Sequence, residues 1–265
     1  MTSNGDSVLH AYGVVEGAGA GDLPLTGIGQ TPVRLVEVGD LSIIVGDLPS
    51  SEYGEAAWAE HAQDPAWLEP VARGHHDVLQ TLVEDADVLP LRLPGIYPDE
   101  QTLSDAFTSA HDDLIERLCF VSGHREWSVH VFLESEDTGE PETATPASGR
   151  DYLLMRKQQV EQKGSSQQER QVLAIEVYEG LNRTSRASVV NLVQDRALSG
   201  RTEPMLLNSA HLVARDEEQD FLAVAVDLDH YVGATGGLRV EVSGPWPPYN
   251  FTHVSDEPRM DGGGP

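Results

Sequence analysis

Ten histidines and a single cysteine are the side chains of this sequence best suited to bind metal or attack a substrate. The adjacent pair His75-His76 falls in a stretch with helical spacing, where neighbouring side chains point about 100° apart. Only one of the two can therefore face a given ligand, and His61 is the candidate for a third position. The alternative that we favour is a half-buried, hydrogen-bonded His75 beside a surface His76.

The remaining chemistry-bearing patterns are weak. Cys119 stands between Leu118 and Phe120 in an apolar helical stretch, which predicts an inert core thiol. The glycines of 17–21 follow a predicted strand as in a dinucleotide-binding loop, but Asp22 stands where that fingerprint needs its last glycine, and Pro24 follows. No serine lies in a Gly-x-Ser-x-Gly elbow. We therefore expect a protein that is not an enzyme, with no catalytic residues, no metal and no cofactor.

Charge bounds the choice of partner. The sequence has 44 acidic and 17 basic residues, a net charge of −27. Such a surface repels phosphate backbones and anionic lipids, so we expect neither nucleic acid nor membrane as a partner. The charge is explained by solubility alone, by adaptation of the host to salt, or by a need to keep a hydrophobic client dispersed. The lone cysteine, the polar N-terminus and the lack of a long apolar run predict a cytoplasmic location.

The first half of the sequence alternates strand and helix patterns. Strands are predicted at 8–16, 33–38 and 41–45, the last two joined as a hairpin through Gly39-Asp40. Apolar residues at helical spacing predict helices over 68–82 and 103–121, and strands are expected at 88–93 and 126–133. This order predicts an N-terminal domain, residues 1–134, with helices on one face of an antiparallel sheet.

The second half repeats this logic after a break. Residues 135–149 are acidic and rich in proline, threonine and serine, which predicts a linker. A long helix over 151–181, weakened near Gly164, then strands at 187–193, 205–214 and 238–242 and a helix at 217–232 predict a C-terminal domain, residues 150–254. Residues 255–265 are expected to be a disordered tail. The predicted fold class is α+β, with two domains that each have a small antiparallel sheet.

The least ordinary stretch is the proline-aromatic segment, residues 244–251 (GPWPPYNF). Three prolines in four residues favour an extended backbone that carries large aromatic side chains. Either these side chains cover the open face of the second domain, or they present a rigid platform to a partner. The candidate partner-binding or structural residues here are Trp246, Pro247, Pro248, Tyr249 and Phe251.

This ending, preceded by a predicted strand, resembles the C-terminal signature of the gas vesicle GvpF/GvpL family. Weaker pieces agree in order from about residue 8 to residue 251. VLPLRL at 88–93, which contains Arg92, resembles the family's VLP-x-R-F segment. GHREW at 123–127, which ends in Trp127, resembles its G-x-x-EW strand entry, and LLNSAHLV at 206–213 resembles its LLN-x-AYLV strand. Residues 93–96 depart from the family after the arginine.

The resemblance implies a fold and a role. It implies that one or both domains are ferredoxin-like variants. It implies an accessory or minor structural protein of gas vesicle assembly that binds the hydrophobic shell protein GvpA, and other gas vesicle accessory proteins, and that limits GvpA aggregation during nucleation. The protein would be associated with gas vesicles, the gas-facing side of the shell being one position. Arg92 and Trp127 join the candidate residues through their place in the shared pieces.

Two other classes of function stay open from the sequence. A small-molecule-binding enzyme or sensor would use a deep polar pocket ringed by His75, His76 or Arg92. A plain oligomeric scaffold would associate with itself in the absence of any client.

Overall fold

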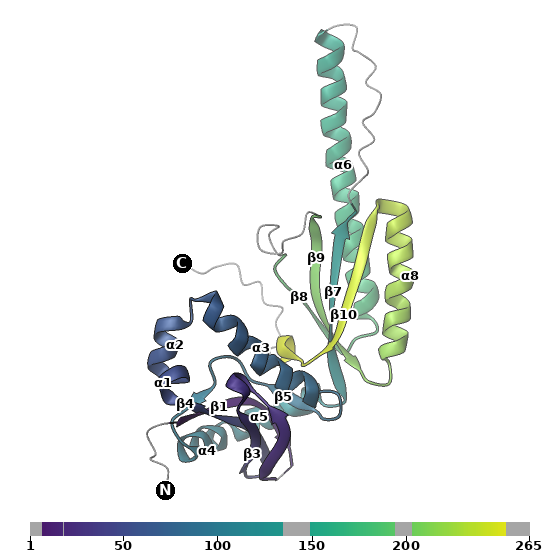
Figure 1. Cartoon of the computed structure of the whole chain (residues 1–265). Coiled ribbons are helices and arrows are strands. Elements are labelled where there is room, and N and C mark those ends of the chain that lie inside the picture. The colour runs from purple at the N-terminus through teal and green to yellow at the C-terminus, as the bar shows by residue number, and fades with distance from the viewer. Residues whose placement is uncertain (1–6, 18, 135–148, 194–202, 253–265) are drawn as a thin grey trace. The chain divides into compact units, whose positions relative to one another are not determined.

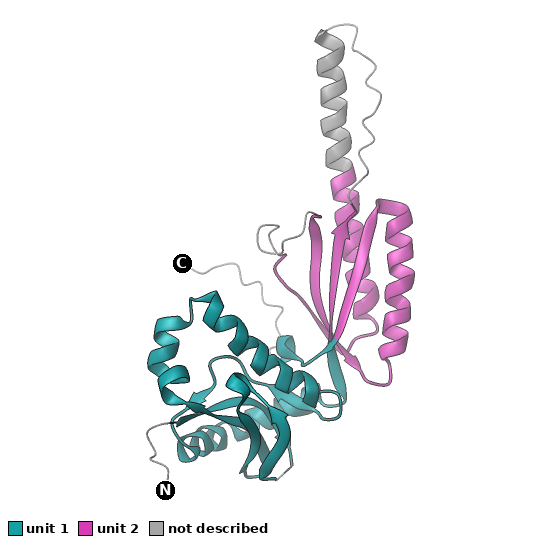
Figure 2. Ribbon diagram, in the orientation of Figure 1, with its two compact units in different colours: residues 1–126, 245–265 teal, residues 127–244 magenta. Residues whose placement is uncertain are grey.

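Two compact units make up the chain (Figure 2). Unit 1 comprises residues 1–126 and 245–265, and unit 2 comprises residues 127–244. Unit 2 is therefore an insertion within unit 1, and the chain passes between the units twice. The structure, a computed structural model, describes residues 7–17, 19–134, 149–193 and 203–252, with the side chains of the helix that begins at 149 described from residue 166. The expected linker, apart from Gly149, and the expected tail lie outside these residues.

Unit 1 is built on an antiparallel sheet (Figure 1). Its strand order is β2-β3-β4-β1-β5, with β6 also paired to β1. The strands are β1 (Ser7–Glu16), β2 (Gly21–Thr26), β3 (Pro32–Val38), β4 (Leu41–Pro49), β5 (Val88–Pro90) and β6 (Ile96–Tyr97). A short 3-10 helix, η1 (Ile28–Gln30), joins β2 to β3.

The hairpin expected from Gly39-Asp40 is confirmed, since Val38 pairs with Leu41 across it. Gly39 has φ 67°, a left-handed conformation that glycine adopts without strain. Strand β2 was not expected, because Pro24 interrupts its pattern. It is an edge strand, where proline is tolerated because one side of the backbone needs no partner.

Helices cover both faces of this first sheet, where we expected one covered face. The helix α3 (Pro65–Leu82) buries its apolar face, including Val71 and Val78, against Ile44 and Leu48 of β4. Their neighbours in β4, such as Ile43, point to the opposite face and are equally buried. The helices on that side are α4 (Glu100–Ser109) and α5 (His111–Val121), and the short helices α1 (Ser50–Tyr53) and α2 (Glu55–His61) precede α3 (Figure 1).

Unit 2 has a regular β-α-β-β-α-β order, the ferredoxin-like arrangement. Its elements are β7 (His124–Leu133), α6 (Gly149–Asn182), β8 (Ala187–Val190), β9 (Met205–Ala214), α8 (Glu218–Gly236) and β10 (Leu238–Trp246). The strand order is β10-β7-β9-β8. Alternate residues of β7, among them Trp127 and Val129, contact Val177 of α6 and Phe221 of α8 in one core. Both helices therefore pack on the same face of this sheet.

Strand β7 corrects the expected domain boundary. The alternation of residues 126–133 identified the strand, but we assigned it to the first domain. It pairs in the sheet of unit 2, between β10 and β9, and so supplies the first strand of the ferredoxin-like order. At the other end, residues from 245 onward belong to unit 1.

Two further expectations about helices are corrected. The predicted helix over 103–121 is two helices, because the backbone turns at Ala110. Cys119 is exposed, although its sequence neighbours are apolar, because a helix turns it away from the buried Leu118. In the part of the chain that is described, no helix combines the length and apolar character needed to cross a membrane.

Candidate functional site

The proline-aromatic segment packs within unit 1. Its first residues extend β10, and the chain then turns at Pro248 into a 3-10 helix, η2 (Tyr249–Phe251). Phe251 is 3% exposed, Pro247 and Pro248 are buried, and Tyr249 packs against the core that α3 covers. The expected continuous extended backbone is therefore interrupted, and the aromatic side chains serve the first unit rather than the open face of the second.

Glu126 fixes this segment through two hydrogen bonds from Asn250. Its carboxylate is 3% exposed, and it accepts hydrogen bonds from the Asn250 backbone N–H at 2.8 Å and from Asn250 Nδ2 at 2.7 Å. Burial raises the pKa of Glu126 to about 7, although both hydrogen bonds act to lower it. Burial and the nearby Glu126 charge also raise the pKa of Tyr249. The anchor is thus a carboxyl group that titrates close to neutral pH.

Helix α3 also contacts the segment. Gln80 Nε2 donates to the Pro245 carbonyl oxygen at 2.9 Å. The ring of His76 lies 5.6 Å from that of Trp246 and 6.1 Å from that of Tyr249. These contacts join residues that are more than 160 positions apart in the sequence. They pack residues 245–249 against α3 within unit 1.

The remaining candidate residues lie elsewhere. Arg92 is exposed in the stretch that follows β5, and it is not part of the segment's packing. Trp127 is 7% exposed in the core of unit 2, where its Nε1 donates to Glu218 at 3.3 Å. The seven candidates therefore divide into five residues that belong to one packed segment, one exposed arginine and one core tryptophan.

His75 pairs with His10 of β1 and not with its sequence neighbour His76. His75 is hydrogen-bonded, as the favoured interpretation required, but it is fully buried at 3% exposed rather than half-buried, and His76 is partly buried rather than on the surface. The distance between His75 Nδ1 and His10 Nε2 is 2.9 Å. The Leu91 carbonyl oxygen, 3.0 Å from His75 Nε2, fixes the proton on that nitrogen, so His75 Nδ1 accepts from His10. Burial lowers the pKa of His75 to about 4 and that of His10 to about 3. Both rings are neutral members of the core.

A serine-histidine pair in unit 2 is equally buried. Ser209 and His211 are both 0% exposed on β9, with 3.1 Å between Ser209 Oγ and His211 Nε2. His211 Nδ1 lies 3.1 Å from Ser185 Oγ, whose own proton goes to the Leu181 carbonyl oxygen. Burial lowers the pKa of His211 to about 4. A nucleophile needs access to its substrate, and this pair has none, so its visible role is to satisfy polar groups in the core.

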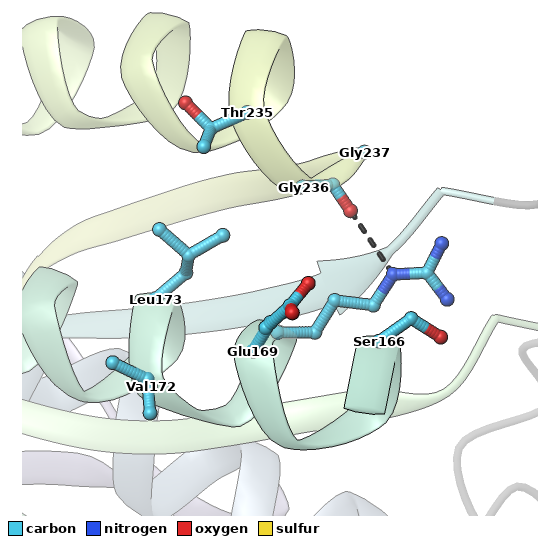
Figure 3. Close-up of a pocket in the computed structure, with 8 residues that line it drawn as sticks. Ser166, Glu169, Val172, Leu173, Thr235, Gly236 and Gly237 are labelled. Atoms are coloured by element: carbon cyan, nitrogen blue, oxygen red, sulfur yellow. Dashed lines mark hydrogen bonds between the residues drawn. The ribbon is translucent and has the colours of Figure 1, made fainter. Parts of the chain in front are cut away.

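Within the described part of the chain, each unit has a groove that is open to solvent. The groove in unit 2 has a volume of about 630 Å³ and lies where α6 passes the end of α8 (Figure 3). Across it, Arg170 Nε donates to the Gly236 carbonyl oxygen at 3.1 Å, a favourable cation position at a helix C-terminus. The groove in unit 1, about 620 Å³, is lined mainly by apolar residues that include Trp58, Leu68 and Leu93. Neither groove is lined by His75, His76 or Arg92, and the described residues form no cluster suited to a metal ion.

The two units differ more in their exposed apolar side chains than in their grooves. Among the described residues, seven large apolar side chains are about half exposed or more, and all seven belong to unit 2. They are Val172 and Ile175 on α6, Val190 on β8, Leu192 and Val193 just beyond it, and Val226 and Tyr231 on α8. Scattered exposed apolar residues are ordinary, but the three within four positions at β8 are a local concentration.

Several of these residues were missed in the sequence. Glu126 lies in a strand where alternation with the buried Trp127 suggests a solvent-facing carboxylate, and its partner Asn250 is 124 positions away. The one sequence signal that could have linked Glu126 to Asn250 is that the Glu126-Trp127 pair and the proline-aromatic segment occur together in this sequence. A strand was predicted at 187–193, but not that it lies at a sheet edge with Val190, Leu192 and Val193 exposed, because a β-branched composition suits a central and an edge strand equally.

Comparison with known proteins gives one consistent family. The family model for gas vesicle synthesis protein GvpL/GvpF matches residues 8–253. The chain is 34% identical over 237 residues to gas vesicle protein L of a Streptomyces species, with 87% of each chain covered. It is 24% identical over 264 residues to gas vesicle protein F2 of Halobacterium salinarum, with 97% of this chain and 99% of the relative covered.

Solved structures agree in fold. A crystal structure of gas vesicle protein GvpF from Anabaena is similar with a TM-score of 0.67 and 17% identity, covering 94% of this chain and 97% of that one. A crystal structure of GvpF from Microcystis aeruginosa has a TM-score of 0.65 and 18% identity, covering 93% and 99%. The expected α+β fold with two antiparallel sheets is confirmed.

Proposed function

This chain belongs to the gas vesicle synthesis protein GvpL/GvpF family, and from that premise we propose that it is an accessory or minor structural protein of gas vesicle assembly that binds the hydrophobic shell protein GvpA. In this role it limits GvpA aggregation during nucleation of the vesicle. The observation that carries the proposal is the family match over residues 8–253, which leaves neither unit outside it.

The division of surface properties supports a client-holding role. Unit 1 has 25 acidic and 6 basic residues, a net charge of −19, and unit 2 has 19 and 11, a net charge of −8. The exposed apolar side chains belong to the less charged unit. A protein of this kind offers a hydrophobic client some apolar contact while its remaining surface repels other copies of the complex.

The mechanism follows from what a shell subunit exposes before assembly. A protein that packs into a water-excluding wall presents apolar faces and strand edges while it is still free. Covering them with a strongly acidic partner keeps the subunit in solution until it is incorporated. We propose a cytoplasmic protein that is associated with gas vesicles, the gas-facing side of the shell being one position, and that also contacts other gas vesicle accessory proteins.

The alternative class, a small-molecule enzyme or sensor, gains no particular support. The deep polar pocket that it requires around His75, His76 or Arg92 is not among the grooves described above. His75 is committed to a core hydrogen bond.

Co-expression tests the proposed function. GvpA is produced with and without this chain, and its soluble fraction is measured after centrifugation of the lysate. We expect the soluble fraction to rise when the chain is present, and the two proteins to co-purify. Equal soluble yields with and without the chain would refute the proposal.

A further inference from the structure

Strand β8 ends the sheet of unit 2, in the order β10-β7-β9-β8 (Figure 1). Among the described residues, no strand pairs with its outer side. The inner side is fixed to β9 in a continuous register from Ala187↔Leu212 to Val190↔Ser209. The bond from Asn191 N–H to the Asn208 carbonyl oxygen, 2.7 Å, continues this register by one residue beyond β8.

The register determines which backbone groups face outward. In an antiparallel ladder, the residues of a hydrogen-bonded pair direct both N–H and C=O to each other, and their neighbours direct theirs away. Because Asn191 bonds to Asn208, residues 187 and 189 also face β9. Ser188 and Val190 therefore direct their N–H and C=O groups to the open edge. These four groups form a template for one added strand.

The edge is held rigidly. Ser188 Oγ donates to Asn182 Oδ1 at 2.5 Å and lies 2.8 Å from Tyr178 Oη, and both partners are on α6. Beyond β8, Asn208 Nδ2 donates to the Leu192 carbonyl oxygen at 2.9 Å. A strand fixed to both a helix and its inner neighbour loses little further freedom on pairing, so it is a good acceptor for a partner strand.

The other strands that end the two sheets are protected, and β8 is not. Natural edge strands carry charges, prolines, bulges or very short lengths that block pairing with other chains. Strand β2 has Asp22 and Pro24, β10 has charged side chains and a proline near its end, and β5 has three residues. Strand β8 has the sequence ASVV and continues as NLV, with Val190, Leu192 and Val193 exposed by 54%, 85% and 48%.

Local charge favours an uncharged partner here. Residues 180–194 form the longest run without an acidic residue in this acidic sequence, and the run includes Arg183 and Arg186. Residues 180–194 therefore bring no carboxylate of their own to the contact with an apolar strand. A second copy of the chain would bring its own net charge of −27 to the contact, which opposes self-pairing.

We propose that the outer edge of β8 binds the shell protein by strand addition, pairing with a short, uncharged, apolar β-strand of that client. The contact uses the outward N–H and C=O groups of Ser188 and Val190, and the apolar side chains of residues 190–193 flank the added strand. This inference rests on the proposed function and names the surface that performs it.

Substitutions at Val190 test the edge directly. Val190→Lys places a charge in the contact, and Val190→Pro removes an outward N–H without removing a bond to β9. The control is Val226→Lys, since Val226 is also 54% exposed but lies on α8, away from the edge. Each variant is co-expressed with GvpA, and soluble, co-purified GvpA is measured. We expect both Val190 variants to lower it about tenfold, the effect of 1.4 kcal/mol in binding, and the control to lower it less than about twofold.

The outcomes separate the two proposals. If the unmodified chain does not keep GvpA soluble, the proposed function fails and this occupant of the edge fails with it. If the unmodified chain does and Val190→Lys does so equally well, the edge inference alone is overturned. Loss in Val226→Lys as large as in Val190→Lys also overturns it, as does a dimer of the chain alone that Val190→Lys dissociates. Thermal unfolding of each variant verifies that the fold is retained.

Discussion

Unit 1 and unit 2 are built from similar elements but differ in charge and in how completely their sheets are covered. Unit 1 has the greater share of negative charge, covers both faces of its sheet, and buries titratable groups such as His10, His75 and Glu126. Unit 2 covers one sheet face with two helices and leaves apolar side chains exposed along α6, α8 and the edge strand β8. The contrast teaches that the proline-aromatic segment belongs to the unit whose sheet is covered on both faces, while the exposed apolar side chains of the described residues are on the inserted unit.

The largest test of this division removes a buried phenylalanine from each unit. Phe251→Ala should cost unit 1 about 3–5 kcal/mol of unfolding free energy, because a fully buried ring leaves a cavity. Phe221→Ala, at a 0% exposed position, is the matched change in unit 2. Hydrogen exchange with mass spectrometry should show faster exchange in the unit that carries each substitution. Faster exchange of unit 2 in Phe251→Ala would break the division.

The next largest effect separates the units by pH. The folded-state pKa of Glu126, about 7, lies above its ordinary value of 4.5, so the folded state binds the extra proton between these values. Its contribution is fully present below pH 4.5 and is lost as pH rises through 7. We expect unit 1 to lose about 3 kcal/mol of stability from this group between pH 4.5 and 8. Glu126→Gln should remove that slope.

Histidines provide the internal control for the pH experiment. Burial lowers the pKa of His75 in unit 1 and of His211 in unit 2 to about 4, so both units should lose stability as pH falls below 6.5. From pH 6.5 to 8, where the histidines contribute no slope, the remaining loss from Glu126 should be confined to unit 1. Denaturant unfolding across pH, resolved by unit through hydrogen exchange, measures both limbs. A loss of unit 1 stability between pH 6.5 and 8 that survives in Glu126→Gln would contradict the assignment.

The smallest expected effect concerns Trp246. Its ring is partly buried against His76, so Trp246→Ala should lower the stability of unit 1 by about 1–2 kcal/mol and leave a folded protein. Because the ring packs within unit 1, the variant should still keep co-expressed GvpA soluble. If the variant folds with unchanged stability but no longer keeps GvpA soluble, the proline-aromatic segment contacts the client, and the division between the two units is wrong.

Sequence periodicity predicted the elements of unit 2 well. Strand β9 was placed at its observed bounds, and α8 differs by a few residues. Alternation identified β7 but not its sheet, because a strand between two sequence-distant neighbours carries no local mark of either. The break at Ala110 was missed, since apolar spacing continues from Phe107 to Leu114 across it.

The candidate site was predicted less completely. The proline-aromatic segment was found because its composition is unusual, but its packing partners His76, Gln80 and Glu126 are contributed by distant parts of the sequence. That β8 is an edge strand could not be predicted from the sequence for another reason. Whether a strand is central or terminal depends on the order of the whole sheet, and β-branched residues are equally suited to both positions.

The insertion of unit 2 within unit 1 sets an order of events during synthesis. Glu126 and Asn250 are 124 positions apart, so at about 5–20 residues per second the ribosome needs roughly 6–25 seconds between them. Throughout that interval unit 1 lacks the piece that closes it, while unit 2 is being completed. Burial of Phe251 can thus take place only after the whole of unit 2 has been synthesised, and a completed first unit reports that translation has passed the insertion.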